Sequence, residues 1–303
     1  MELMEDFFAA RFALRRSADG RAVAGEVVFP PDLQGPPDRA HGGGVTAACF
    51  RLAAEVLGPG DGTVPRALPL GITMALKEEF PLGAAVRAEA EASADGACRV
   101  RLAGPKGLIA EATGGRPPAP PPDPQPARAR WESTRGTSLT VPGTGGCLAC
   151  GAENPRGLFM RLEYNDEFVW KAITPRPHFR NLNGTAFWGV APIMLDEIGW
   201  WLGAIQAQEF GVTNIVEVAI HRPIPAGELI VLGRRADLRQ LNKRTWRAPA
   251  VLMDPAWSVL ASAEVEFAAS RVYARLLLPA FETASDQEAL RRVFPKYADE
   301  RKG

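Results

Sequence analysis

The sequence has few cysteines and no excess charge of either sign. Four cysteines in 303 residues are too few for a disulfide scaffold. Lys and Arg (35) balance Asp and Glu (35), so the chain lacks the basic character that nucleic acids or anionic lipids attract. No run reaches the roughly 20 apolar residues of a membrane helix, and the N-terminus is acidic where a secretory signal is basic. We therefore expect a protein of a reducing compartment, the cytoplasm, with no nucleic-acid or membrane partner.

Proline, by contrast, is concentrated near the middle of the chain. Seven prolines lie between Pro117 and Pro126. Because proline has no amide donor and a fixed φ, residues 116–130 are expected to be extended and to lie outside any sheet or helix. The predicted organisation is a unit over 1–115, a proline-rich linker over 116–146, a second unit over 147–275 and a helical tail over 276–303.

The two units are similar in pattern. Residues 72–88 and 216–233 each consist of an alternating strand, a turn with proline and glycine, and a second alternating strand. Upstream of each lies an apolar helical stretch, at 43–57 and 189–207. A helix that is apolar nearly all round is buried. We therefore predict an α+β fold in which each unit wraps an antiparallel sheet, its strands joined by hairpins, around one central helix.

One carboxylate breaks the apolar character of the second helix. Asp196 lies in its middle, and a buried carboxylate costs several kcal/mol unless it is paired or reaches water in a cleft. Asp196 is thus a candidate for chemistry, the alternative being a structural carboxylate that caps a neighbouring loop. Glu197 lies about 100° further round the helix, and we interpret it as a bystander at the interface between the units.

Three segments resemble known motifs. Residues 33–44 (LQGPPDRAHGGG) are similar to the helix-entry motif of hotdog-fold acyl-CoA thioesterases of the PaaI-like type. Residues 147–158 (CLACGAENPRGL) resemble the cysteine-rich segment that often precedes a hotdog unit in that superfamily, and 190–201 resembles the helix with the catalytic acid. The resemblance implies a double hotdog fold, with two hotdog units fused in one chain.

Each unit retains part of the family pattern, which is His-Gly-Gly followed by an acid nine residues after the His. The first unit has His41 and Gly42, but Phe50 stands at the acid position. The second has Asp196, but Phe187 and Trp188 replace the His and the first Gly. A glycine amide and an acid eight residues further along one helix are about 12 Å apart, so both groups of one unit cannot touch the same thioester carbon. In the family, the glycine of one unit faces the acid of the other. The resemblance therefore implies one asymmetric site between the units.

The leading hypothesis is hydrolysis of an acyl thioester, either acyl-CoA or an acyl-carrier protein. In it the Gly42 amide at the helix start polarises the carbonyl, Asp196 is general base or nucleophile, and His41 orients the thioester or the glycine turn. The predicted substrate-binding residues are Gln34, Gly43 and Trp200. No cofactor is expected, and a homo-oligomer is possible.

Two other functions and a metal site are weighed against this hypothesis. A double-hotdog dehydratase that acts on a 3-hydroxyacyl thioester would use His41 and Asp196 as a dyad, although Trp200 stands where such enzymes usually have Gln or His. A non-catalytic acyl-CoA-binding module is the third possibility. Cys147 and Cys150 have the spacing of half a zinc site, but no second cysteine pair follows and the other two histidines lack ligand spacing. We therefore predict no metal.

Overall fold

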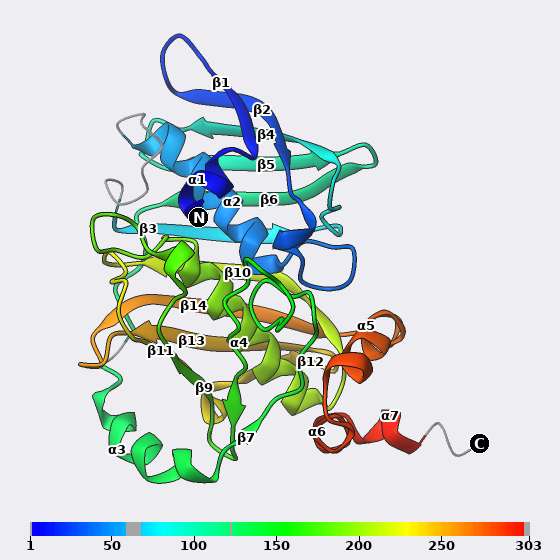
Figure 1. Ribbon diagram of the computed structural model, residues 1–303. Helices are drawn as coiled ribbons and strands as arrows, with labels where there is room; N and C mark the ends of the chain where they lie inside the picture. The colour runs from blue at the N-terminus through cyan, green and yellow to red at the C-terminus, as the bar shows by residue number, and fades with distance from the viewer. Residues whose placement is uncertain (1, 59–67, 122, 300–303) are drawn as a thin grey trace.

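The computed structural model describes residues 2–58, 68–121 and 123–299; parts of the predicted first unit, linker and tail lie outside them. Two stacked halves share one antiparallel sheet of 14 strands (Figure 1). The first half contains α1 (Met4–Ala9), β1 (Phe12–Arg16), β2 (Ala22–Val28), α2 (Gly42–Leu57), β3 (Leu70–Leu76), β4 (Ala85–Ala92), β5 (Cys98–Gly104) and β6 (Gly107–Gly115). The second contains β7 (Leu139–Thr140), β8 (Glu163–Tyr164), β9 (Phe168–Ile173), α4 (Val190–Ala207), β10 (Gly211–Ile220), β11 (Leu229–Arg234), β12 (Arg239–Asn242), β13 (Thr245–Met253) and β14 (Val259–Ala269).

The sheet topology has the same internal repeat as the sequence. The strands of the first half are ordered β2-β4-β5-β6-β3, and those of the second β9-β11-β13-β14-β10. The two halves join where β3 pairs antiparallel with β10. The prediction that consecutive strands form hairpins is wrong for β3 and β4, and for β10 and β11, which are not paired with each other. The chain instead crosses from the central strand β3 over β6 and β5 to β4, and likewise from β10 over β14 and β13 to β11.

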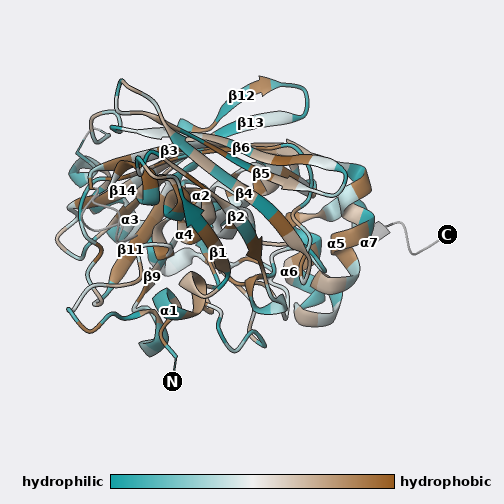
Figure 2. Ribbon diagram, turned by 90° about the horizontal axis from the view of Figure 1, so that it is seen from above, coloured by the Kyte–Doolittle hydropathy of each residue, from teal (hydrophilic) through white to brown (hydrophobic). Residues whose placement is uncertain are grey.

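The two long helices lie on the same face of the sheet, each against the strands of its own half (Figure 2). α2 and α4 also pack against each other. Nearly every residue of α4 is buried, as its uniformly apolar sequence requires. These observations confirm the predicted α+β class, with an antiparallel sheet wrapped around a central helix in each half. The difference from the prediction is that the two sheets are continuous.

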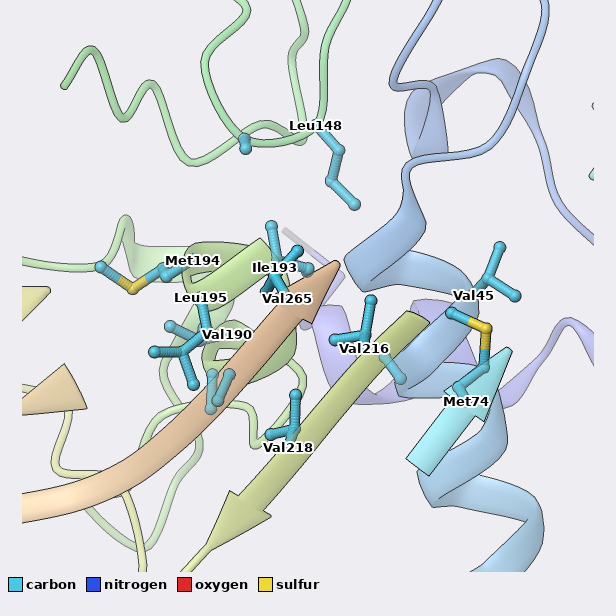
Figure 3. Close-up of a cluster of buried hydrophobic side chains, with 14 of the residues drawn as sticks. Val45, Met74, Leu148, Val190, Ile193, Met194, Leu195, Val216, Val218 and Val265 are labelled. Carbon is cyan, nitrogen blue, oxygen red and sulfur yellow. The ribbon is translucent and has the colours of Figure 1, made fainter. Parts of the chain in front are cut away.

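Apolar side chains fill the space between the helices and the central strands. Met74 of β3 and Val216 of β10 are cross-strand partners, and both lie beside Val45 of α2 (Figure 3). Leu148, from the segment that precedes the second half, points toward the start of α2. This core joins the halves into one packed unit, so residues at the helix starts have defined neighbours from the other half.

The proline-rich segment departs from the prediction. α3 (Gln125–Thr134) begins inside residues 116–130, which were expected to exclude a helix. The reason is that Pro124 and Pro126 stand at the cap and the first turn, where no backbone amide needs an acceptor. The end of the predicted linker also belongs to the second half, because β7 pairs with β8.

The C-terminal part of the described chain is helical and packs against the second half. It comprises α5 (Arg271–Ala284), α6 (Gln287–Val293) and α7 (Pro295–Asp299), so a helix runs across the predicted boundary between 275 and 276. Phe281 and Phe294 are buried against Phe210, which follows α4; Phe294 stacks on its ring and Phe281 meets it edge-on. None of the helices in the described part of the chain is long and apolar enough to cross a membrane.

Candidate active site

The start of α2 meets the middle of α4. His41 is the N-cap of α2, and its Nδ1 accepts a hydrogen bond from the Gly43 amide at 3.0 Å. The same amide donates to Asp196 Oδ2 at 2.7 Å. Gly43 allows this approach because a Cβ there would lie 2.4 Å from the Pro192 carbonyl oxygen of α4. The structure thus brings His41, the glycine turn and Asp196 together across the boundary between the halves.

Asp196 is buried but hydrogen-bonded at both oxygens. The residue is 4% exposed, Oδ1 accepts from the Thr213 hydroxyl at 2.9 Å and Oδ2 accepts from Gly43. Burial raises the pKa of Asp196 above its ordinary value, although His41, Thr213 and Gly43 each favour the carboxylate. A carboxylate with a raised pKa is a stronger proton acceptor than a solvated one.

His41 connects Asp196 to a second acid. Its Nε2 lies 3.2 Å from Glu197 Oε2, and Trp201 Nε1 donates to the other oxygen of Glu197 at 3.0 Å. Burial opposes a charge on the ring, but hydrogen bonds to Cys147 and Glu197 outweigh it, so the pKa of His41 is raised well above its ordinary value. Glu197 thus lies at the interface between the halves, as predicted, with its side chain turned toward His41.

Cys147 and Cys150 lie beside this histidine. All four cysteines are free and buried. Cys147 Sγ accepts a hydrogen bond from the Ala149 amide at 3.3 Å. The hydrogen bond with Cys150 and the neighbouring His41 lower the pKa of Cys147 to about 6, against the effect of burial, whereas the pKa of Cys150 is raised. The sequence motif indicated these cysteines, but not that they reach His41.

A small pocket with a volume of about 100 Å³ opens onto this cluster. Its polar lining residues include His41, Gly42, Asp196 and Glu197, and its apolar ones come from both halves, with Leu76, Phe80, Trp200, Leu277 and Phe281. Gly42 is the first residue of α2, and within the described residues its amide has no hydrogen-bond acceptor. An unpaired amide at a helix start is suited to a developing negative charge.

Of the three predicted substrate-binding residues, one lines the pocket and two do not. Trp200 lines the pocket and donates from Nε1 to the Gly211 carbonyl at 3.0 Å. Gln34 is absent from the pocket wall, and its side chain accepts from the Asp38 amide instead. Gly43 is also absent from the wall, because its amide is used by His41 and Asp196.

The equivalent position in the pseudo-symmetric half contains aromatic rings. Phe50 and Trp188 lie 6.1 Å apart between ring centroids, and Phe187 lies 5.0 Å from Trp188. All three are buried, and Phe8 of α1 packs on Phe187 at 5.4 Å. Among the residues that the structure describes, aromatic rings thus stand where the first site has its histidine and carboxylate.

Comparisons with known proteins agree with this architecture. No family model matches the sequence, and no curated protein matches it. Among solved structures, a protein from Novosphingobium aromaticivorans assigned as a thioesterase aligns with a TM-score of 0.55 at 16% identity over 85% of this chain and 98% of its own. The dehydratase domain of PpsC from Mycobacterium tuberculosis, in complex with C12:1-CoA, has a TM-score of 0.54 at 16% identity over 85% and 97% of the two chains. A hot dog fold protein of unknown function from Alicyclobacillus acidocaldarius aligns with a TM-score of 0.51 at 13% identity, over 87% of this chain and 98% of its own. The chain has the hotdog fold.

Proposed function

We propose that this protein hydrolyses an acyl thioester at one asymmetric site between its two hotdog halves. The observation that carries the proposal is the meeting of Asp196 from α4 with the glycine-rich start of α2, with the Gly42 amide left free at the pocket. An electropositive donor for a carbonyl oxygen and a buried base then lie on the same pocket wall.

In the proposed reaction, the thioester carbonyl oxygen accepts from the Gly42 amide. Asp196 takes a proton from water, whose oxygen attacks the carbonyl carbon. The tetrahedral intermediate collapses, the carbon–sulfur bond breaks and the thiolate leaves with the proton returned from Asp196. Direct attack by the Asp196 carboxylate, followed by hydrolysis of the anhydride, is the alternative sequence. His41 is a positioning residue, since its Nδ1 caps the helix start.

The pocket fits an acyl thioester in its chemistry. The wall beyond the carboxylates is largely apolar and aromatic, which suits an acyl chain from a CoA or carrier-protein thioester. The four free cysteines are consistent with the cytoplasm, where thiols stay reduced.

A hydro-lyase that acts on a 3-hydroxyacyl thioester is the second candidate. The observation that favours it is the 3.4 Å between His41 Nδ1 and Asp196 Oδ2, which brings an imidazole and a carboxylate from different halves together. Dehydration requires a base that removes the proton beside the carbonyl and an acid that protonates the leaving hydroxyl, and this pair could supply both.

The experiment is a panel of saturated and 3-hydroxyacyl-CoA thioesters assayed in parallel for free thiol and for enoyl product. Hydrolysis predicts thiol release with saturated substrates and no enoyl thioester. Enoyl product without thiol would overturn the proposal in favour of the lyase. Saturable acyl-CoA binding with neither product would assign a non-catalytic binding module.

A further inference from the structure

Three side chains on one side of the pocket form a compact set of metal-ligand donors. A ring nitrogen of His41, the Sγ of Cys147 and a carboxylate oxygen of Glu197 all lie within 4.8 Å of one another. Each of the three residues is buried. Cys150, also buried, is hydrogen-bonded to Cys147 through its side chain. The cluster therefore gathers one sulfur, one imidazole and one carboxylate from three segments far apart in the sequence, and a second thiol, that of Cys150, lies beside Cys147.

We propose that His41, Cys147, Cys150 and Glu197 bind a zinc ion in a tetrahedral site. Zinc prefers thiolate and imidazole ligands and also accepts a carboxylate oxygen, and four protein ligands are typical of a structural site. The two-residue spacing of Cys147 and Cys150 is one that zinc sites commonly use. The sequence indicated half of this site; the other half comes from α4 and from the cap of α2.

The residues around the cluster have the arrangement that metal ligands require. The Ala149 amide donates to Cys147 Sγ at 3.3 Å, which stabilises a thiolate. Trp201 Nε1 donates to Glu197 Oε1 at 3.0 Å and leaves Oε2 to face His41. Such outer partners orient ligands and tune metal affinity.

The two ring nitrogens of His41 face different groups, so Nε2 is available to a metal while Nδ1 stays beside the start of α2. Nε2 faces Glu197 and the metal cluster, whereas Nδ1 faces the Gly43 amide and Asp196. With zinc on Nε2, the neutral ring carries its proton on Nδ1, 3.4 Å from Asp196 Oδ2, and Nδ1 no longer accepts from the Gly43 amide. The Gly43 amide then keeps its hydrogen bond to Asp196 at 2.7 Å.

The proposed ion would tie the two halves together beside the pocket. His41 belongs to the first half, Glu197 to α4 of the second, and the cysteines to the segment before β8. With all four positions occupied by protein, the ion has no open position for water or substrate, so its role is to fix His41 and the start of α2. This inference stands apart from the proposed hydrolysis, because a zinc site here would also fit a lyase or a binding module.

The test is a Co²⁺ titration of the full-length protein, stripped of metal by a chelator and kept reduced. We expect one Co²⁺ per chain, the intense visible bands of tetrahedral cobalt, and near-ultraviolet thiolate-to-cobalt charge transfer, all displaced by one equivalent of Zn²⁺. Cys150→Ser is expected to reduce the charge-transfer intensity by about half, since one of two thiolates is lost, and Glu197→Gln to alter the visible bands. Cys98→Ser, a buried cysteine of β5 outside the cluster, is the matched control and is expected to leave the spectrum unchanged.

The wild-type protein decides the inference even where a ligand variant fails to fold. Folded, reduced wild type that binds no Co²⁺ at micromolar concentration overturns the site. Binding with octahedral bands, or with no charge transfer, also overturns it. Trp201→Phe removes an outer hydrogen bond and keeps all four ligands, so it should weaken Co²⁺ affinity by about 10- to 100-fold with the same spectrum. Unaltered affinity in that variant would contradict the assignment of Glu197 as a ligand. Metal binding without thiol release from acyl-CoA would refute the proposed hydrolysis and leave the zinc site intact.

Discussion

The Gly43 amide donates a hydrogen bond to Asp196 Oδ2 at 2.7 Å, although the two residues are 153 positions apart. This contact joins the start of one buried helix to the middle of the other. It places the carboxylate beside Gly42, the first residue of α2, which lines the pocket.

Asp196→Asn should abolish most turnover without unfolding the protein. Asparagine keeps the size of the side chain, and its carbonyl can still accept from Thr213, but it cannot take a proton from water. Loss of a general base costs about 10²- to 10⁴-fold in kcat. The loss in kcat is measured as thiol release from the acyl-CoA of the panel that the wild type hydrolyses fastest. The control is Asp237→Asn at an exposed position, which is expected to retain full activity. Wild-type turnover in folded Asp196→Asn would refute the assigned role.

Gly42→Ala should lower kcat with little effect on folding. A Cβ at position 42 would lie 2.7 Å from Asp196 Oδ2, so the carboxylate must shift. A displacement of this kind costs about 100-fold in rate. Gly44→Ala is the matched control, because a Cβ at that position meets nothing nearer than 3.6 Å. Equal activity of the two variants would show that the position of Asp196 relative to Gly42 is unimportant.

Gly43→Ala, one residue along, should destabilise the whole fold. Its Cβ would approach the Pro192 carbonyl oxygen to 2.4 Å and the Ile193 Cα to 2.6 Å, and these are backbone atoms that cannot rotate away. Overpacking of this kind costs about 1–3 kcal/mol. Urea unfolding followed by circular dichroism would measure the loss against Gly44→Ala. A midpoint equal to that of the control would mean that α2 and α4 can separate freely.

Phe50→Ala should cost stability and leave chemistry unchanged. Phe50 occupies the acid position of the pseudo-symmetric site and packs on Trp188 rather than on the pocket. Truncation of a buried phenylalanine costs about 3–5 kcal/mol.

The readout for Phe50→Ala is thiol release per folded molecule, alongside the free energy of unfolding. Leu182→Ala is the control, since Leu182 is 96% exposed and its loss should change stability by no more than about 0.5 kcal/mol. A specific loss of turnover in folded Phe50→Ala would argue for a second working site rather than one asymmetric site.

Several features were readable from local sequence because they depend on neighbouring residues. The periodicity of residues 43–57 and 189–207 identified both buried helices, and the strand patterns at equivalent places indicated the repeat. The pairing of His41 with Asp196 was implied by the resemblance to hotdog thioesterases rather than by local pattern, and the structure places the two side chains 3.4 Å apart.

Other features depend on contacts between segments that no local pattern connects. The pairing of β3 with β10, in place of the expected hairpins, is decided by how the halves meet. Helix α3 forms where prolines indicated extended chain, because Pro124 and Pro126 fall at the helix start. Helix geometry sets the direction of the Glu197 side chain relative to Asp196. Its hydrogen-bond partner, however, is His41 from the other half, which the local sequence around Glu197 does not indicate.

The sequence by itself thus determined the repeated units, their buried helices and the anomalous carboxylate, because hydrophobic periodicity and helix geometry act over a few residues. Tertiary structure decided that the Gly43 amide is taken by Asp196 and that Cys147 and Glu197 meet at His41. Those contacts arise from the packing of α2 against α4 and of the 147–150 segment over both, which brings together side chains that share no spacing along the chain.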